Sequence, residues 1–176
     1  AGLSSTCVVV QTQGREAEQS GRAASLAAAV YESIRQTVRA ARLECVRLGE
    51  GVGDPTERLR LLCEASVVIV DLAGAGPEVL FAAGIRHGLR PAGTIVVSDS
   101  APLPALVLAA GEVVNYPIHP PSADSAGWRR FGSRLSERLH ATANETLPTS
   151  PVYQALPGLR PATWVPKRRR VFLSYV

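Results

Sequence analysis

Residues 66–72, SVVIVDL, place the strongest restriction on the fold. Four successive apolar residues, Val67 to Val70, precede Asp71. A strand with one solvent-exposed face alternates apolar and polar residues, whereas a strand covered on both faces is apolar throughout. Strands of the second kind belong to parallel sheets that carry helices on both faces. The segment therefore predicts a central parallel strand that ends on a carboxylate.

Segments with strand patterns and helix patterns alternate along the chain. Short β-branched runs predict strands, and apolar residues three or four positions apart predict helices. The predicted strands are residues 5–12, 43–48, 66–72, 93–99 and 112–118. The predicted helices are residues 22–41, 54–65, 77–89 and 126–145. Because β–α–β crossovers are right-handed, this order predicts one α/β domain with an open, flavodoxin-like parallel sheet of about five strands and helices on both faces.

The second predicted helix has a clear start signal. Asp54 precedes Pro55, and Glu57 follows three residues after Asp54. An aspartate at the N-cap accepts hydrogen bonds from free N–H groups of the first turn, and proline is tolerated at the first helical position. The sequence therefore predicts a helix that begins at Pro55 and is capped by Asp54.

Charge and composition argue against several classes of function. The net charge of +4 is equalled by the run PKRRR, residues 166–170, so the rest of the chain is nearly neutral and nucleic-acid binding is not expected. No apolar run approaches the ~20 residues of a membrane span, and no leader pattern is present, so we expect a cytoplasmic protein without membrane binding. Three cysteines without close Cys or His neighbours argue against a disulfide framework and a zinc site. We expect neither a metal nor a cofactor.

Polar residues and glycines follow the predicted strands, at the edge where open α/β sheets bind ligands. They are Gln11, Thr12, Gln13, Gly14, Asp71, Gly74, Gly76, Ser98 and Asp99. Neither QTQGREAEQSGR nor DLAGAGPE has the spacing of a P-loop or of a dinucleotide fingerprint, so a nucleoside triphosphatase or a dehydrogenase is not expected. The sequence leaves two interpretations of Asp71 open. Its carboxylate either accepts hydrogen bonds from a ligand, or it caps the turn and helix that follow.

Three segments carry a resemblance to a known family over roughly residues 6–118. In chain order they are VYESIRQTVRAARLEC, LCEASVVIVDLAGAGPEVLFAAGIRHGLRP and GTIVVSD. They resemble nucleoside 2-deoxyribosyltransferase-like domains, in which a strand ending in Asp leads to a helix that opens with Pro and closes with Gly-Ile-x-His. The resemblance is nearest to the branch that forms the N-terminal sensor region of apoptosis signal-regulating kinases and occurs in related bacterial signalling and conflict proteins.

The chain also departs from the family pattern at two positions. The nucleophilic glutamate of the family falls on Ala82, and the asparagine that follows the proline falls on Glu78. The kinase sensor branch similarly lacks the glutamate. A methyl group can neither attack nor stabilise a positively charged sugar carbon. The residues that do match the motif are Asp71, Pro77, Gly84, Arg86 and His87.

The resemblance implies a regulatory module, degenerate for catalysis, that binds a nucleotide-derived small molecule or a partner protein. An alternative is an active nucleoside or nucleotide N-glycosidase in which Asp71 orients the ligand and Glu78, one helical turn before Ala82, acts on the sugar. A third hypothesis is a scaffold for homo-oligomers. Glu78 and Arg86 also have structural interpretations, as charges that suit the two ends of the helix dipole. The expected ligand-binding residues are Gln11, Gln13, Gly14, Asp71, Gly76, Glu78, Arg86, Ser98 and Asp99.

The last part of the chain differs from the rest in composition. Residues 147–170, LPTSPVYQALPGLRPATWVPKRRR, predict a linker after a domain formed by residues 1–146, since their prolines interrupt regular elements. Residues 171–176, VFLSYV, resemble the first strand of a Toll/interleukin-1 receptor (TIR) domain, which implies a linked effector in signalling or defence. Alternatively, these residues form a final edge strand of the same sheet.

Deletion of residues 160–176 tests this division of the chain. If these residues belong to a linker and to the next domain, the Tm of the shortened chain stays within about 2 °C of the Tm of the full chain, because no core contact is lost. Differential scanning calorimetry of the two chains measures the difference. A fall of about 10 °C or more would instead make VFLSY an integral strand of this sheet.

Overall fold

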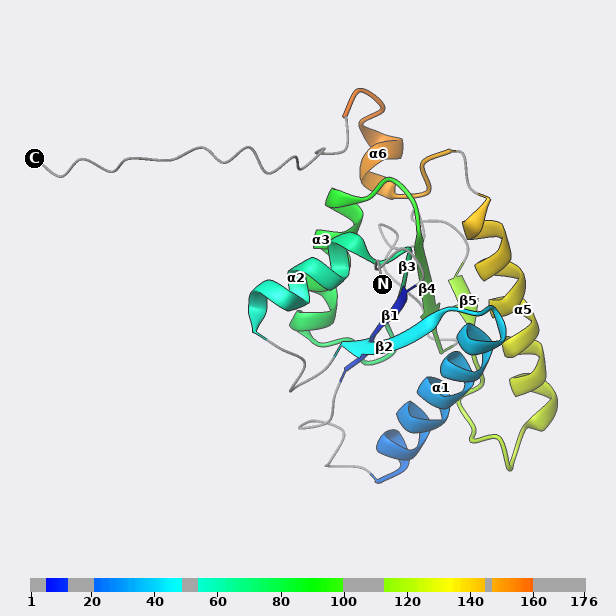
Figure 1. The fold of residues 1–176 in the computed structure, drawn as a ribbon. Helices are drawn as coiled ribbons and strands as arrows, with labels where there is room; N and C mark the ends of the chain where they lie inside the picture. Colours follow the sequence, from blue (N-terminus) through cyan, green and yellow to red (C-terminus); the bar gives the residue numbers. More distant parts are fainter. Residues whose placement is uncertain (1–5, 13–20, 49–53, 100–112, 145–146, 160–176) are drawn as a thin grey trace, which may run out of the picture.

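The computed structural model describes residues 6–12, 21–48, 54–99, 113–144 and 147–159, and within them the chain forms one five-stranded sheet (Figure 1). The strands lie in the order β2-β1-β3-β4-β5, and every neighbouring pair is parallel. This is the flavodoxin-like strand order. The open parallel sheet predicted from the sequence is confirmed. The strands are β1 (Thr6–Val10), β2 (Glu44–Leu48), β3 (Val67–Asp71), β4 (Thr94–Ser98) and β5 (Val113–Asn115).

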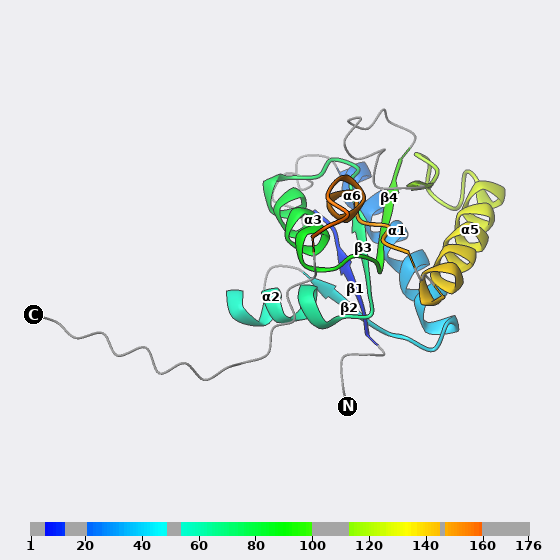
Figure 2. The same cartoon turned by 90° about the horizontal axis from the view of Figure 1, so that it is seen from above.

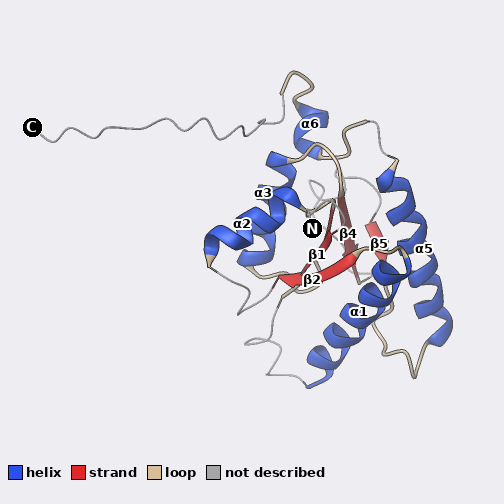
Figure 3. Cartoon of the chain, viewed as in Figure 1, coloured by secondary structure: helices blue, strands red, loops and turns tan. Residues whose placement is uncertain are grey.

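Helices cover both faces of the sheet, as the view from above shows (Figure 2). Helices α1 (Gly21–Ala40) and α5 (Ser125–Ala143) lie on one face, and α2 (Pro55–Glu64) and α3 (Pro77–Leu89) lie on the other (Figure 3). Right-handed crossovers require α1 to lie on one face and α2 and α3 on the other, because the chain moves from β1 to β2 in one direction and from β2 to β3 and β4 in the opposite direction. None of the described helices is both long and apolar enough to cross a membrane.

Alternate residues of the central strands fill two separate cores. In β3, Val67 and Ile69 pack toward α1 and α5, whereas Val68 and Val70 pack toward α2 and α3. Strand β1 divides its residues in the same way. Side chains of a strand alternate between the two faces of a sheet, so a strand with a core on each side needs apolar residues at every position. This explains why SVVIVDL contains no alternation.

The predicted start of α2 is confirmed. The N–H group of Glu57 donates to Oδ1 of Asp54 at 2.9 Å, and Pro55 occupies the first turn. Strand β5 is shorter than predicted and ends at Asn115. Pro117 follows two residues later, and proline cannot donate a hydrogen bond to a strand ladder.

A short helix, α6 (Pro151–Ala155), lies within the segment where we expected no regular element. Proline is tolerated at the first position of a helix, and Ser150 caps the turn by accepting from the N–H group of Val152 at 3.3 Å. Ser150 Oγ donates to the carbonyl of His87 at 2.7 Å, and the hydroxyl of the buried Tyr153 donates to the carbonyl of Gly88 at 3.0 Å. The start of the predicted linker therefore packs on α3. Residues 160–176 lie outside the described residues.

The largest fully buried side chain is that of Arg86 on α3. Its guanidinium has no carboxylate partner in the described part of the chain and instead donates to four carbonyl oxygens. Burial, with a further contribution from the charge of Arg90, lowers its pKa to about 10, so it stays protonated at neutral pH. The four acceptors are Leu62 O at 2.7 Å, Ala65 O at 3.0 Å, Gly93 O at 3.1 Å and Ser66 O at 3.4 Å.

These four carbonyls belong to the end of α2 and to the turns that lead into β3 and β4. Gly93 has a positive φ of 87°, and a Cβ atom there would lie 2.6 Å from the carbonyl oxygen of Ser66 and 2.8 Å from Nη2 of Arg86. Only glycine fits this conformation next to the guanidinium. Arg86 and Gly93 thus form one structural unit that joins α2, α3 and the two central strands.

Replacement of Arg86 by methionine tests this unit. The variant Arg86→Met keeps most of the side-chain volume but leaves buried carbonyls without a donor, so we expect its free energy of unfolding to fall by about 3 kcal/mol or more. Urea unfolding measures the loss. Arg90→Met serves as the control, because Arg90 lies on the surface and should change the stability by about 0.5 kcal/mol or less. Equal losses in both variants would contradict a structural role specific to Arg86.

Candidate functional site

Asp71 lies at the end of β3 and is 3% exposed. Three donors reach its carboxylate. The hydroxyl of Tyr116 donates to Oδ1 at 2.9 Å, the N–H group of Ala73 donates to Oδ1 at 3.1 Å, and Nε2 of Gln11 donates to Oδ2 at 3.0 Å. Since both oxygens are bonded, the carboxylate holds together the ends of β1 and β3 and the segment after β5.

The hydrogen bonds continue from Gln11 to the edge of the sheet. Oε1 of Gln11 accepts from Nη2 of Arg47 on β2 at 2.8 Å, and Nε2 also donates to the carbonyl of Ala27 on α1 at 3.0 Å. The guanidinium of Arg47 lies 4.6 Å from the centre of the Tyr31 ring. We call Arg47, Gln11, Asp71 and Tyr116 the polar chain. It crosses the sheet at the carboxyl ends of the strands, on the face covered by α1 and α5.

Aromatic packing fixes the Tyr116 end of the polar chain. The Tyr116 ring is buried, with its centre 5.7 Å from that of Phe131 and 6.3 Å from that of Trp128, both on α5. Burial raises the pKa of the phenol, and the neighbouring Asp71 charge raises it further. Tyr116 therefore keeps its proton at neutral pH and donates it to Asp71.

Burial raises the pKa of the Asp71 carboxyl to about 6. The hydrogen bonds from Ala73, Tyr116 and Gln11 lower the pKa, and the charge of Asp99 raises it, but burial has the largest effect. The carboxyl therefore changes its protonation state close to neutral pH. Its burial keeps it from meeting a reacting sugar carbon, so its chemistry here is that of a titratable hydrogen-bond acceptor.

Two further predicted residues lie at the same edge. Ser98 ends β4, is 0% exposed, and its Oγ has no hydrogen-bond partner among the described residues. Asp99 follows it and is half-buried, close enough for its charge to influence Asp71 and Tyr116. A buried hydroxyl without a partner is unusual, because such a group loses hydrogen bonds to water without gaining others.

The loop between β3 and α3 is held by Thr12. Its hydroxyl donates to the carbonyl of Gly74 at 3.1 Å and accepts from the N–H group of Gly76 at 3.3 Å. Gly74 has a φ of 59°, in the left-handed region that favours glycine. Gly76 forms the N-cap of α3 without a side-chain cap. These two hydrogen bonds tie the loop to the end of β1. The N–H group of Gly76 is therefore already bonded within the chain.

The structure brings Gln11, Asp71, Ser98, Asp99 and Gly76 together at the predicted edge, whereas Gln13 and Gly14 lie outside the described residues. It places Arg86 elsewhere. The carbonyls that Arg86 contacts at Ser66 and Gly93 precede β3 and β4, at the opposite ends of these strands. The predicted ligand-binding role of Arg86 is therefore wrong, because the guanidinium is buried and committed to backbone carbonyls.

The positions linked to catalysis also differ from the expectation. Ala82 is 7% exposed and packs in the core shared by α2, α3 and the sheet, so α3 does not direct this position at the ligand-binding edge. Glu78 is exposed in the first turn of α3, and its side chain makes no hydrogen bond within the described part of the chain. Neither position supplies a carboxylate to the polar chain.

The sequence did not predict that Arg47, Tyr116 and Tyr31 belong to this site. A weak signal existed for Arg47, which interrupts the apolar strand pattern of ECVRL, and for Tyr116, which follows the predicted last strand. Within the described ranges, no group of three or more His, Cys, Asp or Glu side chains is arranged to hold a metal ion. Comparisons with protein-family models, with curated proteins and with solved structures give no match.

The raised pKa of Asp71 predicts a definite dependence of stability on pH. In the folded chain the carboxyl binds its proton more tightly than in the unfolded chain, where its pKa is the ordinary 3.8. The stability that this tighter proton binding contributes to the folded chain is therefore fully present below the pKa of the unfolded chain, and it is lost as the pH rises through about 6. The free energy of unfolding of wild type relative to Asp71→Asn should fall by up to about 3 kcal/mol between about pH 4 and about pH 7.

Urea unfolding of both chains over this pH range measures the effect. Asp54→Asn is the matched control, because the N–H group of Glu57 lowers the pKa of the exposed Asp54 carboxyl. The free energy of unfolding of wild type relative to Asp54→Asn should rise as the pH rises through the acid range. This pH dependence is opposite in sign to the one expected for Asp71→Asn. A wild type that gains stability relative to Asp71→Asn would show that the Asp71 carboxylate is stabilised by the fold.

Proposed function

We propose that this domain is a regulatory module without catalytic activity. It binds a nucleotide-derived ligand, or a partner protein, at the carboxyl edge of its sheet and controls a linked effector, such as a TIR domain, in signalling or defence. The polar chain is the observation that carries this proposal. It collects a cation, an amide, a carboxyl and a phenol from segments far apart in the sequence at the edge where open α/β sheets bind ligands.

The groups at this edge suit the parts of a nucleotide. The half-buried guanidinium of Arg47 is a partner for a phosphate, and Asp99 is an acceptor for sugar hydroxyls. The hydroxyl of Ser98 is free of hydrogen bonds to the described residues and both donates and accepts. The resemblance to deoxyribosyltransferase-like domains supports the same class of ligand.

The three positions that sequence analysis linked to catalysis, Asp71, Glu78 and Ala82, support binding without catalysis. Cleavage of a nucleoside C–N bond builds positive charge on the sugar, and the enzyme must supply a carboxylate to that carbon. Asp71 is buried and bonded by three donors, Glu78 projects from the first turn of α3, and Ala82 is part of the core. Equal binding of substrate and transition state does not accelerate a bound reaction.

The polar chain also offers a means of reporting that a ligand is bound. Asp71 is held between two protonation states, and the hydrogen bonds of Gln11 and Tyr116 depend on which state is present. A ligand that bonds more strongly to one arrangement increases the population of that arrangement. The change would reach β2 through Arg47 and α5 through the ring of Tyr116.

A panel of nucleosides, nucleoside mono- and diphosphates and dinucleotides tests the proposal. We expect at least one compound to raise the Tm of the wild type, and calorimetry to show that Asp71→Asn weakens its binding by about tenfold or more, because the substitution removes the charge-assisted hydrogen bonds that hold Gln11 and Tyr116 in place at this edge. Asp54→Asn should bind like the wild type. Circular dichroism confirms that each variant is folded at the temperature used.

Chromatography of the same mixtures distinguishes the module from an enzyme. We expect no release of free base above the rate without protein. Base release that Glu78→Gln abolishes would make the domain an N-glycosidase with Glu78 as its catalytic carboxylate. A panel with neither binding nor base release, together with a stable oligomer in sedimentation, would favour the scaffold instead.

A further inference from the structure

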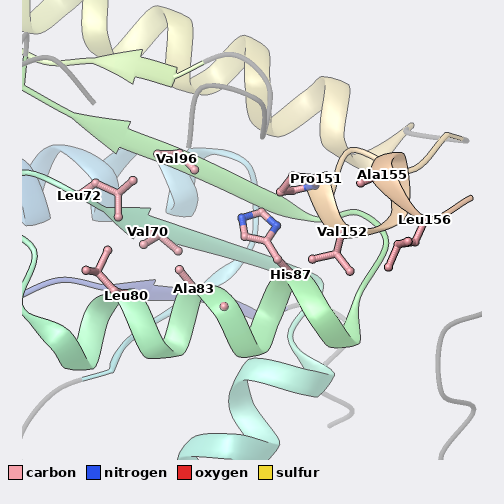
Figure 4. Close-up of a pocket in the computed structure, with 11 residues that line it drawn as sticks. Val70, Leu72, Leu80, Ala83, His87, Val96, Pro151, Val152, Ala155 and Leu156 are labelled. Carbon is pink, nitrogen blue, oxygen red and sulfur yellow. The ribbon is translucent and has the colours of Figure 1, made fainter. Parts of the chain in front are cut away.

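A cavity lies on the opposite face of the sheet from the polar chain. It has a volume of about 480 Å³, is partly open to solvent, and is lined by residues of β3, β4, α3 and α6 and by residues next to them (Figure 4). Its floor is the core itself, formed by Val70 and Val96, both buried. Its rim carries the exposed side chains of Leu80 and Leu156. A concave space with a core floor and this volume is typical of a small-molecule site.

The lining of this cavity is apolar apart from His87. It contains no Asp, Glu, Lys or Arg, so a charged ligand would lose its hydration without gaining a partner. Figure 4 shows His87 projecting from α3 among the apolar side chains of the sheet and of α6. Its Nδ1 is buried and has no hydrogen-bond partner among the described residues. Burial, and next the charge of Arg86, lowers the pKa of the imidazole, which is therefore neutral at neutral pH.

We propose that this cavity binds an uncharged, largely apolar small molecule through one hydroxyl group that hydrogen-bonds to His87. A hydroxyl both donates and accepts, so it satisfies Nδ1 in either neutral tautomer. The rest of the molecule covers Val70, Val96 and the leucines at the rim. This inference is independent of the proposed function, because Val70 and Asp71 are consecutive in β3 and face opposite sides of the sheet.

Helix α3 contains two glycines that make a matched pair of variants. Gly84 lines the cavity and Gly88, one turn further, does not. A Cβ atom built at either position meets no atom within 4 Å, so neither backbone position is too crowded for a residue larger than glycine. Leucine in place of glycine also favours the helix. Gly84→Leu should therefore fill the cavity while the domain stays folded, and Gly88→Leu should leave the cavity open.

The test uses 4-butylphenol, butylbenzene and 4-butylbenzoate as probes of the full chain, with binding followed by calorimetry. We expect 4-butylphenol to bind saturably and about tenfold more tightly than butylbenzene, as one hydrogen bond predicts. Gly84→Leu should weaken this binding by tenfold or more, and Gly88→Leu should not change it. His87→Leu should remove the preference for the phenol over butylbenzene.

Other outcomes would overturn the proposal. No saturable binding to the wild type, or equal binding to Gly84→Leu and Gly88→Leu, would exclude this cavity as the site. Tighter binding of 4-butylbenzoate than of 4-butylphenol would exclude an uncharged ligand. A wild-type dimer in sedimentation that Gly84→Leu dissociates and Gly88→Leu does not would make a second copy of the chain the natural occupant.

Discussion

The arrangement of the central strands depends on the hydrogen bonds that the guanidinium of Arg86 donates. This guanidinium gathers carbonyl oxygens from the end of α2 and from the turns that open β3 and β4. Buried carbonyls need donors, and here one cation supplies several at once. By fixing where β3 and β4 begin, it fixes their register, in which Asp71 lies level with Val97. The position of the polar chain at one end of the strands therefore follows from a side chain at the other end.

Strand β3 separates two environments of opposite chemistry. Its last two residues point to different faces, so that Asp71 joins the polar chain under α1 while Val70 forms the floor of an apolar cavity under α3. Each face is closed by elements from a different part of the chain, α5 on one and α6 on the other. One five-residue strand therefore borders two environments of different chemistry, one on each face of the sheet.

The sequence was sufficient to predict the open parallel sheet and the helices that cover it, though not α6, because the signals for those elements are local. Two-sided burial is visible in SVVIVDL, and the cap of α2 is visible in Asp54 and Pro55. The location of Asp71 at the carboxyl edge followed from the fold. Its partners could not be predicted, since Gln11 is 60 residues away and Tyr116 is 45 residues away. Arg86 was misinterpreted for a related reason, because its acceptors are backbone carbonyls that leave no pattern in the sequence.

The separation between Asp71 and Tyr116 has a consequence for the order in which the domain assembles. On the ribosome, β3 is made before the phenol that donates to its terminal carboxylate, and 45 residues must follow before that donor exists. Until then, burial of the carboxylate under α1 lacks one of its hydrogen bonds and is correspondingly costly. Burial of the Asp71 carboxylate therefore costs least free energy once β5 and α5 have been synthesised. We expect the carboxyl edge of the sheet to stay solvated until then and to become buried late in the synthesis of the domain.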